Sequence, residues 1–327
     1  MKGKKVLVTG SGGFVGSHLV ENLIEQGAQV TALVHYNSQK STACLKYISG
    51  SRDLRVVFGD INDPFFCLDL VKDQEFIFHL GGQISVPYSF LAPKIFFDTN
   101  VLGTINLLEA AKNSTIKRFI YGSSSEVYGT ILKKPVDEDY PLNAQSPYAA
   151  SKIGAEQAVI SYFFSFGLPV TIIRPFNTYG PHQSTRAVIP SIITQILSSS
   201  SKKIKLGSLT TARDFVYVKD VAKAYIKLAM LNTSVGKIIN VGTGRSENLL
   251  TLCQIIMDLT NIKKQIVIDK SRARPEKSEI LDQFSNNAKL KKLTGWEPKT
   301  ALEDGLTETV QWFRKNISNF DSDKYQI

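Results

Sequence analysis

The chain has 327 residues, of which 43% are hydrophobic and 21% are charged, and this composition excludes a disordered, collagen-like or coiled-coil protein. Its net charge is +10, and residues 190–327 hold 22 Lys and Arg against 14 Asp and Glu. This excess fits either a solvated lysine-rich surface or a pocket for phosphate groups. Nucleic acid is not an expected partner, because the densest basic cluster is only Lys202, Lys203 and Lys205.

The sequence pattern predicts neither a membrane span nor a metal site. The apolar runs are too short to cross a bilayer, so no membrane partner is expected. Near the start, residues 6–8 run directly into a glycine loop without a cleavage site, which predicts a cytoplasmic protein. The three cysteines and four histidines are scattered, so we expect free thiols and no bound metal.

Apolar runs in the first half alternate with stretches of helical periodicity. The expected strands are 4–10, 28–34, 55–61, 76–82, 119–125 and 170–176, and the expected helices include 14–26, 98–113 and 147–166. Strands that alternate with helices form a parallel sheet covered on both faces, which suits strands that are continuously apolar.

After residue 181 the pieces become shorter and more mixed. The expected helices are 187–198, 219–231, 249–260 and 300–316, with strands at 203–206 and 237–241. We predict a dinucleotide-binding core at 1–181 and a smaller lobe at 182–327 that closes over one site. Some later segments are expected to return to the core, because no linker separates the two parts.

A glycine loop follows the first expected strand. The segment TGSGGFVG arranges its glycines as G-x-x-G-x-x-G between a strand and a helix. Glycine lets the backbone turn tightly and approach a pyrophosphate, and the helix N-terminus offers free N–H groups to it. A tight turn could show the same residues, but the position after the first strand favours a dinucleotide site. The expected contacts are Gly10, Gly12, Gly13, Phe14, Val15 and Gly16.

The end of the second strand leaves the choice between NAD and NADP open. An acid there would hold the ribose hydroxyls of NAD, but the chain has His35, Asn37 and Ser38. Without a carboxylate a 2′-phosphate is not repelled, and without an arginine it is not strongly attracted. The missing arginine favours NAD. Asp60 and Ile61, after the third strand, are either adenine contacts or part of a plain turn.

Tyr148 and Lys152 form a Y-x-x-x-K pattern at the start of an expected helix. Ser146 suits the N-cap and Pro147 the first helical position, and residues four apart share one helix face. A lysine ammonium there would lower the pKa of the tyrosine hydroxyl. The phenolate could then take a proton from a substrate alcohol as hydride leaves. Downstream of the glycine loop, this common spacing predicts a catalytic pair that also contacts the cofactor.

A polar loop, SSSEVYG at 123–129, follows the fifth expected strand. Strand ends in such sheets line the ligand crevice, where a serine can hydrogen-bond the substrate oxygen that becomes a ketone. Glu126 is more diagnostic, because a carboxylate can remove a proton next to a carbonyl. The residues alone also fit a surface loop with a solvated glutamate. Further cofactor contacts are expected at Leu80, Gly81, Gly82, Asn100 and Ser123.

Together these motifs resemble the extended short-chain dehydrogenase/reductase superfamily, over residues 5–314. The loop at 9–16, Tyr148 and Lys152 match motifs that its members share, and RPFNTYGP and RDFVYVKD look like its substrate-lobe segments. The resemblance implies an α/β fold: a Rossmann-like doubly wound parallel sheet with a smaller mixed α/β C-terminal lobe that binds a sugar nucleotide.

Within that superfamily, the polar loop resembles that of the nucleotide-sugar 4,6-dehydratases. Their pattern is Thr-Asp-Glu or Thr-Ser-Glu before a Val/Leu-Tyr-Gly turn, and Ser124, Ser125 and Glu126 stand at these positions here. Longer runs, such as PYAASKIGAEQ and RPEKSE, look closest to bacterial dehydratases of nucleotide-linked N-acetylglucosamine in legionaminic-acid-type pathways. UDP-glucuronate decarboxylases also carry a Ser-Glu-Val-Tyr-Gly loop, and 4-epimerases share the Tyr and Lys.

The resemblance implies a mechanism in which Tyr148 deprotonates the C4 hydroxyl while hydride passes to the nicotinamide. Glu126 removes the acidified C5 proton and the C6 hydroxyl leaves. Ser125 is too weak an acid to protonate that leaving group alone, so Glu126 could return its own proton. Hydride then returns to C6, which yields a 4-keto-6-deoxy sugar and leaves the cofactor oxidised and tightly held.

A nucleoside diphosphate favours arginine, whose fork matches phosphate oxygens. Arg213 and Arg274 are the candidates, with surface ion pairs as the alternative explanation. Further substrate contacts are expected at Gln83, Ser85, Asn177 and Val188, with Arg186 as a weaker candidate.

The helices expected at 98–113 and 147–166 carry more apolar surface than one buried face needs. Core packing alone could explain this, but we expect a homodimer joined through a four-helix interface.

Three hypotheses for the function follow. The first is a 4,6-dehydratase, the second an epimerase or UDP-glucuronate decarboxylase, and the third a non-catalytic dinucleotide-binding protein. The third would not need Tyr148, Lys152 and Glu126 together.

Overall fold

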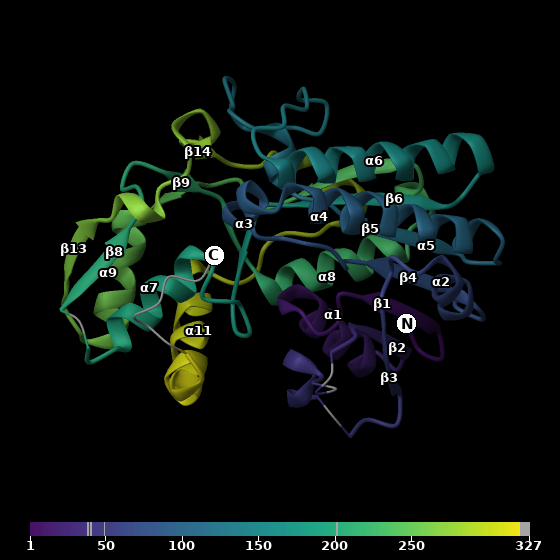
Figure 1. Cartoon of the computed structure of the whole chain (residues 1–327), viewed down its shortest axis with the longest axis horizontal. Coiled ribbons are helices and arrows are strands. Elements are labelled where there is room, and N and C mark those ends of the chain that lie inside the picture. Colours follow the sequence, from purple (N-terminus) through teal and green to yellow (C-terminus); the bar gives the residue numbers. More distant parts are fainter. Residues whose placement is uncertain (38, 40, 49, 201, 321–327) are drawn as a thin grey trace.

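The computed structural model describes residues 1–37, 39, 41–48, 50–200 and 202–320. Within these ranges, seven strands form one parallel sheet in the order β11-β6-β5-β4-β1-β2-β3 (Figure 1). The strands are β1 (Lys5–Thr9), β2 (Gln29–His35), β3 (Leu54–Gly59), β4 (Phe76–His79), β5 (Arg118–Gly122), β6 (Val170–Pro175) and β11 (Lys237–Val241). The predicted doubly wound parallel sheet is thereby confirmed. The order reverses beside β1, and ligands of such sheets bind at the carboxyl ends of the strands there.

Helices cover both faces of the sheet (Figure 1). One face carries α1 (Phe14–Glu25), α8 (Val218–Ala229) and α10 (Ala288–Thr294), and the other carries α2 (Pro64–Val71), α5 (Gly103–Lys112) and α6 (Pro147–Phe166). Successive residues of β1 serve the two layers, since Val6 and Val8 pack in the first cluster and Leu7 in the second. This alternation is the ordinary period of a strand.

The stretch expected as one helix at 98–113 has a more complex form. Two short helices, α3 (Val86–Leu91) and α4 (Pro93–Phe97), precede a π-helical turn over Asp98–Leu102, and α5 continues from it. Such turns frequently occur at functional sites. The turn buries Asn100, which is 1% exposed.

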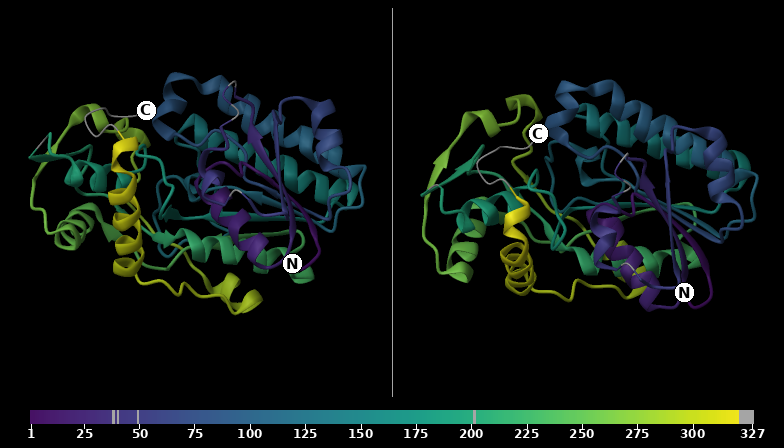
Figure 2. Two further views of the ribbon diagram at one scale, coloured as in Figure 1. Left: turned by 90° about the horizontal axis from the view of Figure 1, so that it is seen from below. Right: turned by 60° about the horizontal axis from the view of Figure 1, so that its bottom comes forward.

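The lobe packs three helices around its own apolar core. They are α7 (Val188–Leu197), α9 (Leu249–Thr260) and α11 (Leu302–Asn316). In α7, Ile189, Ile192, Ile193 and Ile196 are buried, and their spacing puts them on one helix face. Figure 2 shows the lobe at one end of the molecule, with its helix α11 in yellow.

Short strands and turns complete the lobe and its connections. The strands are β7 (Asn177–Tyr179), β8 (Lys203–Leu206), β9 (Ala212–Arg213), β10 (Phe215–Tyr217), β12 (Glu247–Asn248), β13 (Gln265–Ile268) and β14 (Asp282–Gln283). The 3-10 turns are η1 (Ala43–Tyr47), η3 (Ser125–Tyr128), η4 (Asn232–Ser234), η5 (Lys270–Arg272), η6 (Glu276–Ser278) and η7 (Ile317–Asn319). Three segments that follow residue 181 in the sequence, α8, β11 and α10, lie in the sheet half.

The elements that were not expected from the sequence include β13 and α10. Strand β13 pairs in parallel with β8, and no local sequence pattern predicts such a long-range pairing. Helix α10 buries only Leu290, so its periodicity is weak. Among the helices described, none is long and apolar enough to cross a membrane.

Candidate active site

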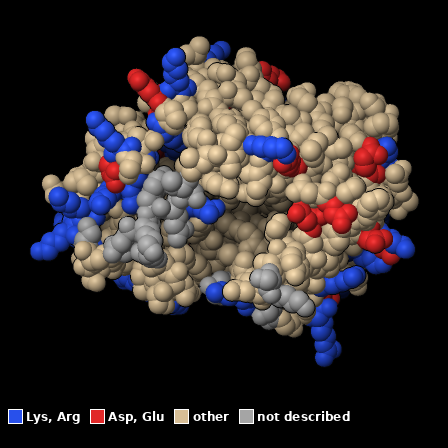
Figure 3. All heavy atoms as spheres, viewed as in Figure 1, with Lys and Arg blue, Asp and Glu red and all other residues tan. Residues whose placement is uncertain are grey.

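A cavity of about 900 Å³ opens at the carboxyl ends of β1, β4 and β5. Figure 3 shows a hollow between the sheet half and the lobe. The predicted cofactor residues that line the cavity are Gly10, Gly12, Gly13, Phe14, Val15, Gly16, His35, Asn37, Asp60, Ile61, Leu80, Gly81, Gly82, Ser123, Tyr148 and Lys152. Ser38 lies outside the described residues. Asn100 lies behind the wall of the cavity and does not line it.

Close packing explains the glycines of the first loop. Gly10 has a φ of +67°, and a Cβ there would lie 2.8 Å from backbone atoms of Leu80 and Gly81. A Cβ on Gly16 would lie 2.2 Å from the carbonyl oxygen of Gly10. Both positions therefore require glycine, because the loop folds back on the start of α1 and on the end of β4.

The residues of this cavity fit a dinucleotide. Helix α1 has Gly13 as its N-cap and no side-chain cap, so its first N–H groups are available to a pyrophosphate. Ser123 Oγ is buried, lines the cavity and has no hydrogen-bond partner among the described residues. Buried hydroxyl groups are normally paired, so a ligand group is a suitable partner for this oxygen.

The structure brings a carboxylate to the end of β2, although the sequence places none there. His35 Nε2 lies 3.5 Å from Asp60 Oδ2, and both residues line the cavity. The backbone N–H of Asn62 donates to Asp60 Oδ1 at 2.9 Å, which fixes the carboxylate in its turn. Asp60 is therefore both a turn residue and a negative charge beside the tip of β2.

Helix α6 presents Tyr148 and Lys152 to the cavity. The Ser146 hydroxyl accepts a hydrogen bond from the backbone N–H of Ala149 at 3.1 Å, and Pro147 opens the helix, as expected. Burial raises the pKa of Tyr148 to about 12, which a hydrogen bond with Ser124 opposes.

Lys152 has a different partner from the one expected. Its ammonium donates to the carbonyl oxygen of Gly122 at 2.8 Å and lies 5.0 Å from the centre of the Tyr121 ring. Burial lowers the pKa of Lys152 to about 8. Burial is the largest cause of the shift, so the pKa of the Tyr148 phenol is raised overall, and the expected lowering by Lys152 stays a prediction.

Asn100 holds the loop that follows β4. Its Oδ1 accepts from the backbone N–H of Gln83 at 2.7 Å, and its Nδ2 donates to the Gln83 carbonyl at 3.0 Å and to Ser151 Oγ at 2.9 Å. A Cβ on Gly82 would lie 2.6 Å from Asn100 Oδ1. Asn100 thus ties this loop to α6, and its place is that of a positioning residue rather than a contact in the cavity.

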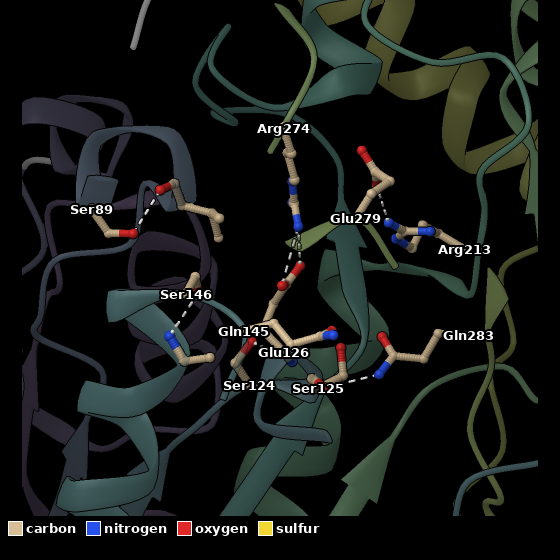
Figure 4. Close-up of polar contacts among 12 residues, drawn as sticks. Ser89, Ser124, Ser125, Glu126, Gln145, Ser146, Arg213, Arg274, Glu279 and Gln283 are labelled. Atoms are coloured by element: carbon tan, nitrogen blue, oxygen red, sulfur yellow. Dashed lines mark hydrogen bonds and ion pairs between the residues drawn. The ribbon is translucent and has the colours of Figure 1, made fainter. Parts of the chain in front are cut away.

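The polar loop after β5 carries the three other predicted catalytic residues into the same cavity. Ser124 Oγ accepts from the backbone N–H of Glu126 at 3.2 Å and caps the turn η3. The carbonyl oxygen of Ser125 accepts from Gln283 Nε2 at 2.9 Å. The Glu126 carboxylate receives two hydrogen bonds from Arg274 Nη1, each of 3.2 Å (Figure 4).

A buried ion pair supports this loop from behind. Arg174 donates to both carboxylate oxygens of Glu156, from Nε at 2.9 Å and from Nη2 at 2.6 Å. Its Nη1 donates to the hydroxyl of Tyr128 at 3.0 Å, and that hydroxyl donates to Asn240 Oδ1 at 2.6 Å. The pair therefore joins β6 and α6 to the last residue of η3.

A second cavity, of about 560 Å³, lies between the first one and the lobe. Among the described residues, the two cavities share Gly13, Phe14, Ile84, Val86, Asn177, Thr178 and Gln183. The predicted substrate residues Ser85, Asn177, Val188, Arg213 and Arg274 line the second cavity, and Gln83 lines the first. The Ser85 hydroxyl also caps α3 by accepting from the backbone N–H of Tyr88.

Arg213 is held inside the protein, so the surface ion-pair explanation fails for it. Its Nη1 donates to the carbonyl oxygens of Ala212 at 2.9 Å and Leu281 at 3.4 Å, and its Nη2 lies 3.2 Å from Glu279 Oε1. Burial, followed by the nearby charge of Arg274, lowers the pKa of the Arg213 guanidinium.

The sequence analysis missed several residues of the second cavity. They include Lys205, Arg272 and Glu279. Arg272 precedes Arg274 by two positions in the run RARP, and this repeat of arginines was the signal available for it. In the part of the chain that the structure describes, no group of three or more His, Cys, Asp and Glu side chains is placed to hold a metal ion.

Comparison with known protein families matches residues 7–309 to the family described as GDP-mannose 4,6 dehydratase. The chain belongs to this family. The predicted resemblance to the nucleotide-sugar dehydratase branch of the extended short-chain dehydrogenase/reductase superfamily is confirmed. Closeness to the legionaminic-acid-type group stays a prediction.

Members of both reaction types resemble the chain. The dTDP-D-glucose 4,6-dehydratase of Homo sapiens is 33% identical over 97% of this chain and 92% of its own length. A putative UDP-glucose 4-epimerase of Methanocaldococcus jannaschii is 34% identical over 95% of this chain and 99% of its own. The chain is therefore an enzyme of the nucleotide-sugar dehydratase and epimerase class.

Solved structures show the same two reaction types. DesIV, a dTDP-glucose 4,6-dehydratase from Streptomyces venezuelae solved with NAD and TYD bound, has a TM-score of 0.88 and 29% identity, over 98% of this chain and 100% of its own. The UDP-N-acetylglucosamine 4-epimerase from Methanobrevibacter ruminantium M1 was solved in complex with UDP-N-acetylmuramic acid. It has a TM-score of 0.87 and 33% identity, over 97% of this chain and 100% of its own.

Proposed function

We propose that the chain is a nucleotide-sugar 4,6-dehydratase of the cytoplasm that converts a nucleoside-diphosphate hexose, with N-acetylglucosamine as the favoured sugar, to the 4-keto-6-deoxy product. The observation that carries the reaction type is the position of Glu126 in the same cavity as Tyr148, close enough for its charge to raise the pKa of the phenol. An epimerase returns hydride to the carbon that lost it and never breaks the C5–H bond. A dehydratase must break that bond, and the Glu126 carboxylate is the base that the cavity offers for it.

The cofactor of the proposal is NAD. Two structural neighbours, DesIV and the UDP-glucuronic acid 4-epimerase from Bacillus cereus, were solved with NAD bound. When bound, NAD supplies a hydride acceptor for the oxidation at C4 and a hydride donor for the reduction at C6. The cofactor ends oxidised as it began, so we expect it to be tightly bound and recycled.

Tyr148 takes the proton of the C4 hydroxyl in the proposed mechanism, and Ser124 hydrogen-bonds the same substrate oxygen. Burial gives Tyr148 a pKa of about 12, so it needs a nearby cation to act as a base. Lys152, one turn further along α6, is the cation that lines the cavity with it. The polar loop and the start of α6 thus supply both groups that act at C4.

Glu126 serves both C5 and C6 in this proposal. The Ser125 side chain stands where other members of the branch carry an acid, and a hydroxyl is too weak an acid to protonate the leaving oxygen alone. The carboxyl group that has gained the C5 proton can deliver it to the C6 oxygen. A single residue then completes the elimination of water.

The second cavity is proposed to hold the nucleoside diphosphate. Its arginines Arg213 and Arg274 provide forks that match phosphate oxygens, and Asn177 borders both cavities. Gln83, Ser85 and Val188 complete the proposed substrate contacts. The proposed division remains a dinucleotide-binding part at 1–181 and a mainly sugar-nucleotide-binding part at 182–327.

We also propose a homodimer joined through a four-helix interface, to which each subunit contributes α5 and α6. Large apolar side chains are exposed on α6 and on the helical segments that precede α5, and a second subunit would cover them. They are Leu91, Ile95, Phe97, Leu102, Phe164 and Phe166.

The test is product analysis with a panel of UDP-, dTDP-, GDP- and CDP-linked hexoses in heavy water. A dehydratase lowers the product mass by one water and places deuterium at C5, because the original C5 proton leaves with the water and C5 takes a new proton from solvent as hydride returns to C6. Unchanged mass with a new anomeric pattern and no C5 deuterium would establish an epimerase, which the similarity to two named epimerases makes the second candidate. Loss of carbon dioxide from a UDP-glucuronate substrate would establish a decarboxylase.

A further inference from the structure

Two arginines in the wall of the second cavity each meet a carboxylate of the chain. Arg274 donates to both oxygens of Glu126 at 3.2 Å, and Arg213 Nη2 lies 3.2 Å from Glu279 Oε1 (Figure 4). Both arginines line the cavity that the proposed function gives to a nucleoside diphosphate. Side-chain carboxylates therefore engage the guanidinium groups that the diphosphate would use.

The two arginines differ in burial and in the segment that carries them. Arg213 also donates to two backbone carbonyl oxygens, and its side chain is 8% exposed. Arg274 lies in the irregular segment that follows η5, and its side chain is 24% exposed. A guanidinium on an irregular, more exposed segment can change partners at lower cost than a buried one that belongs to a strand. Of the two arginines, Arg274 is therefore the one whose guanidinium can leave its carboxylate partner more easily.

The pair between Arg274 and Glu126 conflicts with the role proposed for Glu126. Both oxygens of the Glu126 carboxylate accept hydrogen bonds from Arg274, so the carboxylate is aimed at the arginine and not at a bound sugar. The same contact occupies Nη1 of Arg274, one of the nitrogens of the fork that a diphosphate would use. Both groups therefore become available to the substrate only if they separate.

We propose that Arg274 is a substrate-sensing positioning residue that holds Glu126 until the diphosphate of the bound nucleotide sugar takes its guanidinium. This exchange of partners frees the Glu126 carboxylate to act at C5. The inference rests on the proposed function, since it needs a diphosphate ligand in the second cavity. Its consequence is that the base is released only when a substrate with its diphosphate is in place.

Binding experiments test the exchange without measuring turnover. Titration calorimetry with UDP, dTDP, GDP and CDP first identifies the nucleoside diphosphate that the wild-type protein binds most tightly. Glu126→Gln removes the carboxylate that competes for Arg274, so we expect it to bind that probe about three- to tenfold more tightly. The corresponding nucleoside without phosphates should show no such gain.

A matched control separates the exchange from simple relief of charge repulsion. Glu279→Gln also removes one negative charge, from the second cavity, but Glu279 pairs with Arg213. In an Arg274→Gln background, the gain from Glu126→Gln should disappear while any gain from Glu279→Gln persists. Equal gains from Glu126→Gln with and without Arg274 would overturn the exchange, as would an unchanged or weaker affinity of Glu126→Gln. Retention of the wild-type melting temperature shows that each variant is folded.

A crystal structure of the wild-type protein with the same probe gives a test that needs no variant. We expect the Arg274 guanidinium on a phosphate group and no hydrogen bond between Arg274 and Glu126. A complex in which Arg274 keeps its 3.2 Å contacts to Glu126 would overturn the inference and leave the proposed function standing. Failure of every nucleoside diphosphate to bind the wild-type protein would instead remove the proposed function, and the inference with it.

Discussion

The ammonium of Lys152 donates a 2.8 Å hydrogen bond to the carbonyl oxygen of Gly122, the last residue of β5. This contact joins the helix of the Y-x-x-x-K pattern to the strand that precedes the polar loop. Lys152 is 4% exposed, and burial lowers its pKa to about 8, against 10.5 for an ordinary lysine. The fold therefore carries a cation whose charged form it disfavours, which is typical of a functional group.

Replacement of Lys152 should stabilise the protein while it removes activity. Because the pKa is lowered in the folded state, the charge of Lys152 costs stability below pH 8, and this cost fades as the pH rises toward 10.5. We expect Lys152→Met to raise the free energy of unfolding by about 1–3 kcal/mol at pH 7, after the loss of one hydrogen bond. Urea unfolding at pH 7 and pH 10 measures this. A gain of the same size at both pH values would contradict the explanation.

Tyr148→Phe should abolish most of the turnover without disturbing the fold. The phenol hydroxyl is the proposed proton acceptor at C4, and removal of such a group reduces kcat by about 10²–10⁴. Steady-state kinetics on the identified nucleotide sugar measures the change, and circular dichroism checks the fold. A near wild-type rate would remove Tyr148 from its role.

Glu126→Gln should separate the oxidation at C4 from the loss of water. The amide cannot take the C5 proton, so reduced nicotinamide should appear in a single turnover while no dehydrated product forms. Ser125→Ala should reduce turnover much less, because Glu126 serves C6 in the proposed mechanism. Stopped-flow absorbance and product mass spectrometry follow the two steps. Dehydration by Glu126→Gln at the wild-type rate would exclude this residue as the base.

Asp60 should favour NAD over NADP. Its carboxylate lies 3.5 Å from His35 at the tip of β2, where it would repel a 2′-phosphate. We expect NAD to bind at least about tenfold more tightly than NADP, and Asp60→Asn to reduce that ratio several-fold. Dissociation constants of both dinucleotides for both proteins provide the test. A preference that Asp60→Asn leaves unchanged would show that other groups set it.

The buried pair of Arg174 and Glu156 should be costly to break from one side. Glu156 is 0% exposed, so Arg174→Met leaves a buried carboxylate without its cation and should cost about 3–5 kcal/mol. Lys94→Met, which breaks the exposed pair with Asp98, is the matched control and should cost less than about 1 kcal/mol. Chemical denaturation of both variants tests this difference. Equal losses would show that burial does not set the cost.

Local chemistry explains why much of the fold was predictable. Helix α6 occupies the expected residues 147–166 because Ser146 caps its first turn, Pro147 opens it and Gly167 ends it with a φ of +69°. The strands of the sheet are continuous apolar runs, so their positions could also be predicted from the sequence. The π-helical turn at Asp98–Leu102 was not, since a change in hydrogen bonding within a helix leaves the apolar pattern almost unchanged.

Residue types and short spacings also predicted most of the residues of the candidate site. Gly10 and Gly16, Tyr148 and Lys152, and the loop with Glu126 each lie within one local motif, and all of them line one cavity. Asn100 was expected in the cavity but lies behind it, because its direction depends on the π-helical turn.

The sequence by itself determined the order of strands and helices, the glycine loop and the identity of the groups that could do chemistry, because these depend on residues a few positions apart. Tertiary structure alone decided the charge relationships: Asp60 beside His35, Lys152 on Gly122 and Arg274 on Glu126. The last pair joins residues 148 positions apart. That pair depends on how the sheet half and the lobe meet, and the other two depend on how strands and helices pack within the sheet half. No local pattern encodes this packing or the pKa shifts that burial imposes.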